Sequence, residues 1–491
     1  MRGAALDPGP LDPGPLDPKT APTFPMAARA AMGDTQLRQN VRHATDVIQA
    51  KRARVAAEMP DWQELREAGK QIRQHTMEHL DYYLQEFETN CTRAGGVVRW
   101  ARDADEARRI IVGLVKASGS SEVIKIKSMT TEEIQLNSAL EAAGIHPFET
   151  DLAELIIQLG RDRPSHIVVP ALHKNRQQIR EIFQREMNLP ELGEQPQDLA
   201  DAARMFLREK FLRVKTGVSG ANFLIAETGG VCIVESEGNG RMCLTLPETL
   251  ITVAGIDKVL PRFEDLEVML QLLPRSATGE RMNPYNSIWT GVDASDGPRV
   301  FHVVLMDNAR TSVLADAEGR ETLHCIRCAA CQNACPVYRQ TGGHAYGSVY
   351  AGPIGAILTP QLQEMHHAQS LPYASSLCGA CYEVCPVKIN IPEVLIHLRN
   401  KVVKQNTAGV AGLFDVEASA MKAMAMIFRS ERRFRAAQRL GRIAESPLVG
   451  KDGWIKWLPG LLGGWTQVRD LQEMPKETFR DWWKKRGAHG D

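Results

Sequence analysis

The chain has 491 residues, 43% of them hydrophobic and 24% charged, which is typical of a globular protein with two to four domains. Its 59 basic side chains balance its 59 acidic ones, so the net charge indicates neither a nucleic acid nor a membrane surface as partner. No apolar run reaches the length of about 18 residues that a transmembrane helix needs. We expect a cytoplasmic protein, with any contact to a membrane made through a partner.

Residues 1–35 hold a tandem LDPGP repeat, and proline and glycine at this density disfavour helix and strand alike. We expect a disordered Pro/Gly-rich tail there. Residues 36–116 are rich in Ala, Glu, Arg and Gln at helical spacing. They predict a helical N-terminal region of two or three long helices.

Strands alternate with helices over 90–306, which predicts an α/β domain with a mostly parallel sheet. Residues 122–129 alternate like a strand. A helix from Leu152 is followed by a strand over 166–170 and a helix over 173–188. Four further strand-like runs are FLIAET, GVCIVES, TLITVAG and RVFHVVLMD. Glycine and asparagine separate these runs, so we expect the later half of the domain to be more antiparallel.

Two groups of polar residues in this domain are candidates for binding. One group, within 218–240, consists of Glu227, Glu235 and Glu237. Carboxylates among apolar residues can act as bases or bind hydroxyl groups, but turn capping or ion pairing is the favoured interpretation. The other group ends a strand where a helix begins, a natural place for an anion, and consists of Lys125, Lys127, Ser128 and Met129. The glycines lack the full dinucleotide-binding spacing, so no nicotinamide cofactor is predicted.

Seven of the ten cysteines form two motifs. The first motif is Cys325-x2-Cys328-x2-Cys331-x3-Cys335 followed by Pro336, and the second is Cys378-x2-Cys381-x3-Cys385 followed by Pro386. The first has the spacing of bacterial ferredoxins, whereas zinc sites usually pair two C-x2-C units. The motifs therefore predict iron–sulfur clusters. The other cysteines are expected to be buried apolar residues, and they are Cys91, Cys232 and Cys243.

The fourth cysteine of such a motif ligates the other cluster. Crossed ligation assigns to cluster 1 the residues Cys325, Cys328, Cys331 and Cys385, and to cluster 2 the residues Cys335, Cys378 and Cys381. Ser375 stands where the second motif would have its first cysteine. Cluster 2 is then either a three-iron cluster or a four-iron cluster with water, Ser375 or a substrate on its open iron. Electron transfer is the favoured interpretation over Lewis-acid catalysis, and no catalytic residue is assigned.

The segments around and after the cysteines are expected to be helical. Residues 310–400 predict a helical ferredoxin-type domain, because the segment between the motifs exceeds what a compact small ferredoxin needs. Residues 401–491 predict a basic C-terminal helical region. This region contains five of the eight tryptophans. They form either a docking surface for a partner or the core of a small helical cap.

The chain resembles the lactate-utilisation iron–sulfur protein B family over about 36–491. The stretches that carry the resemblance are IKSMTTEEI, GVSGANFLIAETGGVCIVESEGNGRM, CIRCAACQNACPVYRQTGGHAYGSVYAGPIGAILTP, SLCGACYEVCPVKINIPEVL, GGWTQVRD and FRDWWKKR. The family has seven cluster cysteines, so the resemblance implies two [4Fe-4S] clusters, the second held by three cysteines. It also implies a NagB/RpiA/CoA-transferase-like α/β domain and oxidation of L-lactate to pyruvate with partner proteins A and C, allowing growth on lactate.

The favoured function is therefore the iron–sulfur electron-transfer subunit of an L-lactate dehydrogenase complex. No flavin motif is visible, and clusters pass single electrons whereas lactate oxidation moves two, so a partner or another centre has to start the chemistry. One alternative is a stand-alone redox enzyme whose α/β domain binds a carboxylic acid beside the open cluster. Another is a binding or sensory module in which the clusters serve structure.

Overall fold

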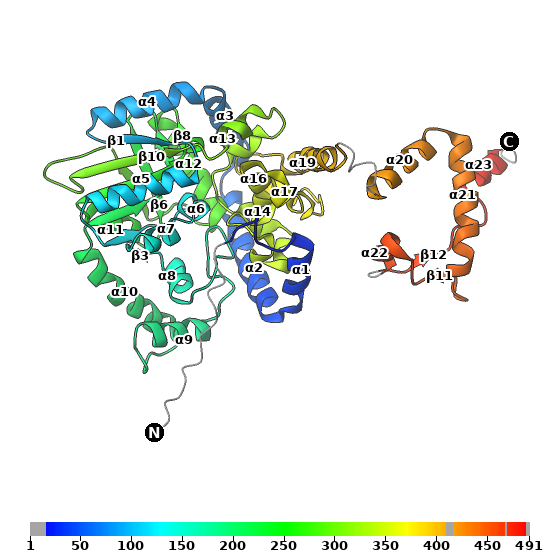
Figure 1. The fold of residues 1–491 in the computed structure, drawn as a ribbon, viewed down its shortest axis with the longest axis horizontal. Helices are drawn as coiled ribbons and strands as arrows, with labels where there is room; N and C mark the ends of the chain where they lie inside the picture. The colour runs from blue at the N-terminus through cyan, green and yellow to red at the C-terminus, as the bar shows by residue number, and fades with distance from the viewer. Residues whose placement is uncertain (1–15, 409–415, 467–468, 488–491) are drawn as a thin grey trace. The chain divides into compact units, whose positions relative to one another are not determined.

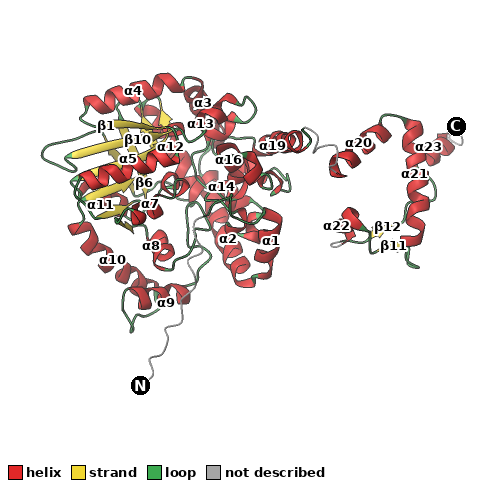
Figure 2. Cartoon of the chain, viewed as in Figure 1, coloured by secondary structure: helices red, strands yellow, loops and turns green. Residues whose placement is uncertain are grey.

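The structure is a computed structural model that describes residues 16–408, 416–466 and 469–487. The chain divides into two compact units, Met1–Val402 and Val403–Asp491, and each is described by itself. Figure 1 traces the chain and Figure 2 separates its helices from its strands. Among the described residues, no helix combines the length and the apolarity that crossing a bilayer requires.

A six-stranded parallel sheet lies at the centre of the α/β part of the larger unit. Its order is β1-β10-β7-β4-β2-β3, and every neighbouring pair is parallel. The strands are β1 (Val97–Ala101), β2 (Glu122–Lys125), β3 (His146–Glu149), β4 (Thr216–Ser219), β7 (Thr249–Gly255) and β10 (Val300–Met306). The apolar run of β7 is buried along its whole length, as expected for a central parallel strand with both faces covered.

Helices cover both faces of this sheet, and the alternation of side chains along β7 supplies both cores. Leu250 and Ala254 face a core with α4 (Leu80–Arg93), whereas Ile251 and Val253 face a core with α5 (Ala104–Ala117). Other helices around the sheet are α6 (Met129–Glu133), α7 (Leu136–Ala142), α8 (Leu152–Leu159), α9 (Arg176–Glu186), α10 (Pro196–Arg213), α11 (Asn239–Thr245), α12 (Phe263–Ala277) and α13 (Arg310–Ala315).

A second, smaller sheet has the order β8-β5-β6-β9. Its strands are β5 (Phe223–Ile225), β6 (Gly230–Glu235), β8 (Val259–Leu260) and β9 (Tyr285–Trp289). β6 pairs antiparallel with both β5 and β9, while β8 runs parallel to β5. The later half of the domain therefore contributes antiparallel pairs here and parallel strands to the main sheet, so the expected α/β class is confirmed.

Three local expectations were wrong. Residues 97–101 form edge strand β1 inside the segment expected to be helical. Residues 166–170 form no strand, because the Nδ1 atom of His166 accepts backbone N–H groups from Val168 and Val169 that a sheet would need. Part of the tail expected to be disordered forms helix α1 (Phe24–Gly33), with a proline in its first turn and Phe24 buried. Residues 1–15 of that tail lie outside the described residues.

The cysteine region is built from short helices that pack against the N-terminal helices α2 (Thr35–Ala57) and α3 (Trp62–Glu78). Its helices are α14 (Ala330–Ala334), α15 (Tyr338–Thr341), α16 (Gly352–Leu362), α17 (Met365–Ala368), α18 (Ala380–Val384) and α19 (Ile391–Asn406). In Figure 1 the blue α2 runs beside α14 and α16. One apolar core joins Val41 and Trp62 to Cys328 and Cys385, so the start of the chain encloses the cysteines.

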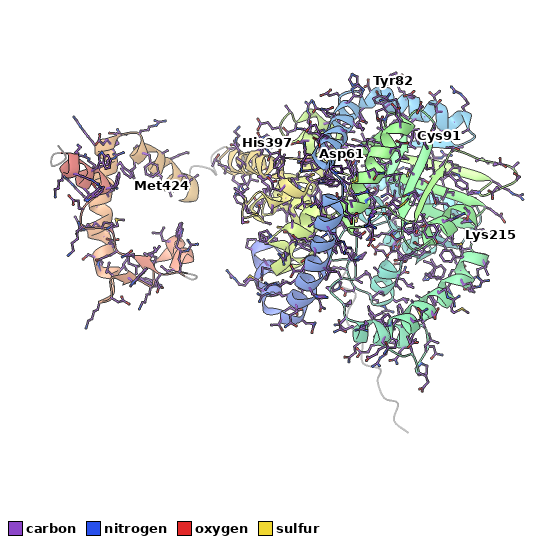
Figure 3. The ribbon with its side chains drawn as sticks, turned by 180° about the vertical axis from the view of Figure 1, so that it is seen from behind. Asp61, Tyr82, Cys91, Lys215, His397 and Met424 are labelled. Carbon is purple, nitrogen blue, oxygen red and sulfur yellow. The ribbon has the colours of Figure 1, made fainter. Side chains whose placement is uncertain are left out.

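The smaller unit contains α20 (Val416–Phe428), α21 (Glu431–Glu445), α22 (Gly463–Thr466), α23 (Phe479–Gly487) and the strand pair β11 (Trp454–Ile455) and β12 (Leu471–Gln472). No residue of α21 is buried. Large apolar side chains are exposed, among them Trp457, Trp483 and Met424, which Figure 3 labels on α20. The exposed tryptophans favour a docking surface over a packed cap.

Candidate functional site

Four of the seven motif cysteines line one narrow cavity, and we call them the first thiol group. They are Cys325, Cys328, Cys331 and Cys385. Apolar side chains, including Ile326 and Ile354, close the cavity. The Cys325 thiol accepts the backbone N–H of Arg327 at 3.3 Å, and the Cys385 thiol accepts that of Ile389 at 3.3 Å. The residues expected to bind cluster 1 are thus brought together.

The other three form the second thiol group, Cys335, Cys378 and Cys381. Burial, together with the neighbouring Cys335 and Cys378 thiols, raises the pKa of Cys381 to about 12. Cys335 and Cys381 are buried, but Cys378 is exposed. The two groups adjoin, since α14 packs against α18 and Cys381 is among the thiols that raise the pKa of Cys331.

The two motifs share one loop conformation. In the first loop Arg327 and Ala329 are left-handed, with φ of 61° and 60°, and in the second Leu377 and Gly379 have φ of 54° and 84°. The first pair flanks Cys328 and the second pair flanks Cys378, and a five-residue helix follows each pair. The hydroxyl of Ser375 accepts the backbone N–H of Leu377 at 3.1 Å, as the Cys325 thiol accepts that of Arg327. Ser375 therefore occupies the position of a cysteine in an intact loop.

The thiol groups fit iron–sulfur clusters. Burial, together with neighbouring thiols, raises the pKa of Cys328 and Cys331, and a bound cation would relieve that crowding of sulfur. The buried Tyr346 hydroxyl lies beside the Cys335 thiol and has no other hydrogen-bond partner among the residues that the structure describes. Both observations indicate a sulfur-rich group at these thiols.

Arginines from the N-terminal helices surround the first thiol group. Arg66 donates from Nε to the carbonyl oxygen of Cys385 at 2.9 Å, and Arg52 donates to that of Val384 at 2.9 Å. Arg73 donates to the carbonyl oxygens of Val259 at 2.8 Å and Leu323 at 2.9 Å. The charge of at least one thiol of this group acts to raise the pKa of each arginine. These guanidinium groups can offset the negative charge of bound thiolates.

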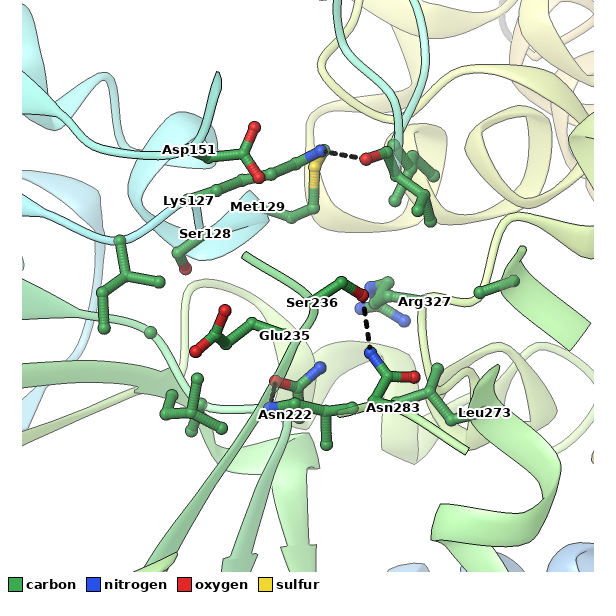
Figure 4. Close-up of a pocket in the computed structure, with 18 of the residues that line it drawn as sticks. Lys127, Ser128, Met129, Asp151, Asn222, Glu235, Ser236, Leu273, Asn283 and Arg327 are labelled. Atoms are coloured by element: carbon green, nitrogen blue, oxygen red, sulfur yellow. Dashed lines mark hydrogen bonds between the residues drawn. The ribbon is translucent and has the colours of Figure 1, made fainter. Parts of the chain in front are cut away.

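A cavity of about 360 Å³ lies between the α/β domain and the first cysteine loop. Figure 4 shows Lys127, Ser128, Met129, Glu235 and Arg327 around it. Arg327 stands between Cys325 and Cys328 in the sequence, so one residue belongs to both the thiol site and the cavity. Volumes of this size are typical of small-molecule sites.

The acidic side chains of the cavity are engaged with backbone. Glu235 accepts the N–H of Gly238 at 2.6 Å, and Glu237 accepts that of Leu152 at 3.0 Å. Burial and the charge of Asp151 raise the pKa of Glu237 to about 7. Glu227, outside the cavity, accepts the N–H of Phe263 at 2.8 Å. These bonds match the capping interpretation of the glutamates.

The basic side chains differ in how far they are engaged. Lys125 is fully buried, pairs with Glu132 at 3.0 Å and with Glu149, and does not line the cavity. Lys127 lines it and donates to the carbonyl oxygen of Val168 at 2.8 Å. Lys258 also lines it and is 8% exposed, and burial together with the charge of Arg327 lowers its pKa to about 7.

Several of these residues could not be found from the sequence. Lys258 and the three arginines lie far along the chain from the cysteines they adjoin, and no spacing marks them. Arg327 could have been found, because its place between two cysteines fixes its distance from the thiols. For Lys258 the only signal is a lysine three residues after the end of the apolar β7 run.

Comparisons with known proteins agree with this arrangement. Residues 84–306 match a LUD domain, 321–389 match a 4Fe-4S dicluster domain, and 399–488 match the C-terminal part of lactate utilisation protein B. The protein is thus an iron–sulfur protein that joins a LUD domain to a ferredoxin-like 4Fe-4S domain.

Full-length relatives identify the family. Lactate utilization protein B 1 of Bacillus mycoides is 43% identical over 95% of this chain and 97% of its own length. Lactate utilization protein B of an Exiguobacterium species is 44% identical over 92% of this chain and 95% of its own. The chain belongs to the lactate utilisation protein B family. A DUF162 family protein structure from Deinococcus radiodurans covers 46% of this chain at 13% identity, with a TM-score of 0.27 that supports no further comparison.

Proposed function

We propose that the protein is the iron–sulfur electron-transfer subunit of a complex that oxidises L-lactate to pyruvate and so allows growth on lactate. The observation that carries the proposal is the side-by-side placement of two thiol groups, one buried and one reaching the surface at Cys378. The curated relatives are named for lactate utilisation. The partners in the proposal are lactate-utilisation proteins A and C, and the location is the cytoplasm.

In the proposal the first thiol group holds a [4Fe-4S] cluster. The second thiol group holds another, either as [3Fe-4S] or as [4Fe-4S] with a non-cysteine ligand. When bound, these clusters supply one-electron storage and transfer. The crossed pairing is supported by the cavity that Cys385 shares with the first motif and by the mutual charge effects of Cys335, Cys378 and Cys381.

The chain itself contributes insulation at one group and access at the other. Apolar side chains and the helices α2 and α3 keep water from the first group. The second group is ringed by exposed apolar side chains, Tyr373, Leu377 and Tyr382. An exposed apolar patch beside an exposed ligand position suits contact with a redox partner. The exposed tryptophans of the smaller unit are a second candidate surface for a partner.

The α/β domain is proposed to be NagB/RpiA/CoA-transferase-like and to span 90–306, followed by the ferredoxin-type domain at 310–400 and the C-terminal helical region at 401–491. The six-stranded parallel sheet with helices on both faces supports the first part. The common core of α1–α3 and the cysteine region suggests that the N-terminal helices belong with the ferredoxin-type domain.

The test is anaerobic purification with proteins A and C, followed by iron determination, EPR spectroscopy and a lactate oxidation assay. We expect about eight irons per chain, two EPR-active centres and lactate-dependent reduction of both. Zinc in place of iron would contradict the proposal. Clusters that lactate does not reduce in the complete complex would contradict it as well.

A stand-alone enzyme is the second candidate function. It requires a carboxylic acid site beside the open cluster, but no cysteine of the second thiol group lines the 360 Å³ cavity, which adjoins the first group through Arg327. This placement weighs against the candidate in that form. Lactate oxidation by the purified chain alone with an artificial acceptor would restore it. Reversible reduction of the clusters in an anaerobic titration would exclude a purely structural role for them.

A further inference from the structure

The 360 Å³ cavity lies at the place where open parallel sheets bind ligands, the carboxyl ends of their strands. Its lining includes residues that directly follow four adjacent strands: Ile126 after β2, Asp151 near the end of β3, Gly220 after β4 and Lys258 beyond β7. Loops at this edge are not fixed by the ladder, so they can present side chains to a bound molecule. The cavity is thus part of the architecture of the sheet.

Two buried cations at one side of the cavity are incompletely partnered. The Lys258 side chain lies in the wall, and none of the residues in the described ranges hydrogen-bonds or ion-pairs with its ammonium group. Arg327 is also 8% exposed, and its Nε atom has no hydrogen-bond partner there. An ammonium group removed from water requires a compensating partner. An anionic ligand would give Arg327 the partner that its Nε atom lacks, and it would favour the protonated form of Lys258, whose pKa burial lowers to about 7.

The surrounding charges leave this side positive. Asp257 pairs with Arg310 at 2.6 Å and with Arg327 at 3.3 Å, and Arg310 also pairs with Glu133 at 2.9 Å. Two carboxylates therefore face the three cations Lys258, Arg310 and Arg327. The cavity's own glutamates and Asp151 accept backbone N–H groups. These bonds orient the three carboxylates, and none of the three forms an ion pair with Lys258.

The rest of the lining is mainly apolar, with a smaller number of amide and hydroxyl side chains. In Figure 4 Met129 lies across the cavity from Asn222 and Asn283, and Leu273 lies beside Asn283. Asn283 donates to the Ser236 hydroxyl at 3.3 Å. Amides and hydroxyls beside short apolar walls suit a small organic acid that carries a second oxygen function. Three helices begin at the cavity, α6 with five residues, α11 with seven and α8 with eight. The first N–H groups of α8 are already accepted by Glu237 and Asp151, so they are not left for a phosphate.

We propose that this cavity binds a small 2-hydroxy or 2-oxo carboxylate, with the carboxylate between Lys258 and Arg327 and the second oxygen toward Asn283 and Ser236. The existence of an organic-acid site follows from the cavity alone. The choice of L-lactate and pyruvate as probes rests on the proposed function. The bound acid then lies on the side of the first thiol group, to which Arg327 is covalently adjacent.

The test is calorimetric titration of the anaerobically purified holoprotein with L-lactate and with pyruvate. Two variants probe the site: Lys258→Met removes the unpartnered charge, and Ser236→Trp blocks the exposed rim without entering a core. Lys215→Met is the matched control, because Lys215 lies on the surface away from the cavity and pairs with Glu248. Iron content and the visible spectrum show that each variant is folded and loaded.

We expect saturable binding to the unaltered protein and to Lys215→Met, and at least tenfold weaker binding to Lys258→Met and Ser236→Trp. Absence of binding to the unaltered protein overturns the proposal. Unchanged binding to Lys258→Met overturns it too. If that variant binds the acids normally but has a shifted reduction potential, the lysine acts on the thiol group instead. Tighter binding of inorganic phosphate than of either acid would overturn the carboxylate class.

These outcomes separate this inference from the proposed function. If neither acid binds but the complete complex still passes electrons from lactate to the thiol-held clusters, the inference fails and the function stands. If an acid binds at this cavity but the complex does not reduce the clusters with lactate, the function fails and the site stands.

Discussion

The two thiol groups are built on the same loop and placed in different surroundings. In each loop, two left-handed residues flank one cysteine, Cys328 in the first loop and Cys378 in the second. In each loop, the side chain at the first position of the motif accepts the backbone N–H two residues later. The first group is enclosed by α2 and α3 with their arginines, whereas the second reaches the surface at Cys378. The loop therefore supplies the ligand geometry, and residues distant in sequence decide burial, charge and access.

The largest expected effect comes from removing the crossing ligands. Cys385→Ser should remove the cluster of the first group and Cys335→Ser that of the second, although each lies in the opposite motif. Iron determination and EPR on the two variants should each show loss of about half the iron, with complementary signals remaining. The reverse pattern of signals would show that each motif serves its own cluster.

The next largest effect compares the arginine side chains that hold the backbone around the two thiol groups. Arg73→Met leaves buried carbonyl groups near the first group without donors, so the free energy of unfolding should fall by about 3 kcal/mol or more. Arg399→Met is the counterpart at the second group, where the half-buried Arg399 bonds the carbonyls of Pro372 and Ser375. We expect about 1 kcal/mol there. Urea unfolding of the loaded proteins measures both, and equal losses would refute the distinction.

The next prediction concerns the pH dependence of stability, which we expect to arise from Glu237 in the lining of the cavity. Its pKa is raised from 4.5 to about 7, mainly by burial, so the folded state favours the protonated acid. Stability should therefore be highest at low pH and fall as pH rises from 4.5 through 7. Water still reaches Glu237, so we expect a loss of only about 1 kcal/mol.

Glu237→Gln keeps an acceptor for the Leu152 N–H and has no carboxyl to titrate. The difference in urea midpoint between this variant and the unaltered protein, measured at pH 5 and at pH 8, isolates the effect. A difference that does not change with pH would exclude a raised pKa at Glu237.

The smallest expected effect comes from replacing the serine at the first position of the second motif. Ser375→Cys should give the second group a fourth thiol without rebuilding the loop, because the hydroxyl already accepts the N–H that a cysteine thiol accepts in the first loop. We expect up to about one additional iron per chain and an altered EPR signal of the second group only. Ser375→Ala is the matched control. An unchanged signal in the cysteine variant would show that the loop cannot present a fourth ligand.

How much could be predicted from the sequence depended on the range of the interactions. The cysteine spacing is local, and it brought Cys325, Cys328 and Cys331 together as expected. The alternation of apolar runs located β7 and β10, which are buried on both faces. Edge strand β1 was missed because it lies between two helical stretches, and its sequence VVRWA lacks the regular apolar–polar alternation of a half-buried strand.

The missed features depend partly on a local side-chain bond and partly on contacts between distant residues. His166–Pro170 has the composition of a strand, but its N–H groups bond to the ring of His166. Arg66 bonds to the carbonyl oxygen of Cys385, which is 319 residues away, and no sequence pattern near Arg66 predicts this bond. The cavity likewise forms only when four strand ends and a cysteine loop meet. Motif spacing therefore predicted which thiols lie together, and only the fold shows their surroundings.

The enclosure of the first thiol group by α3 also sets an order of events during synthesis. Arg66 leaves the ribosome 319 residues before Cys385, whose carbonyl it binds. At about 5–20 residues per second, this interval lasts roughly 15 to 65 seconds. During that time the arginine-bearing helices have no acceptor loop to close on. Under the proposed crossed ligation, insertion of iron and sulfur into this group has to follow translation of the second motif, which supplies Cys385.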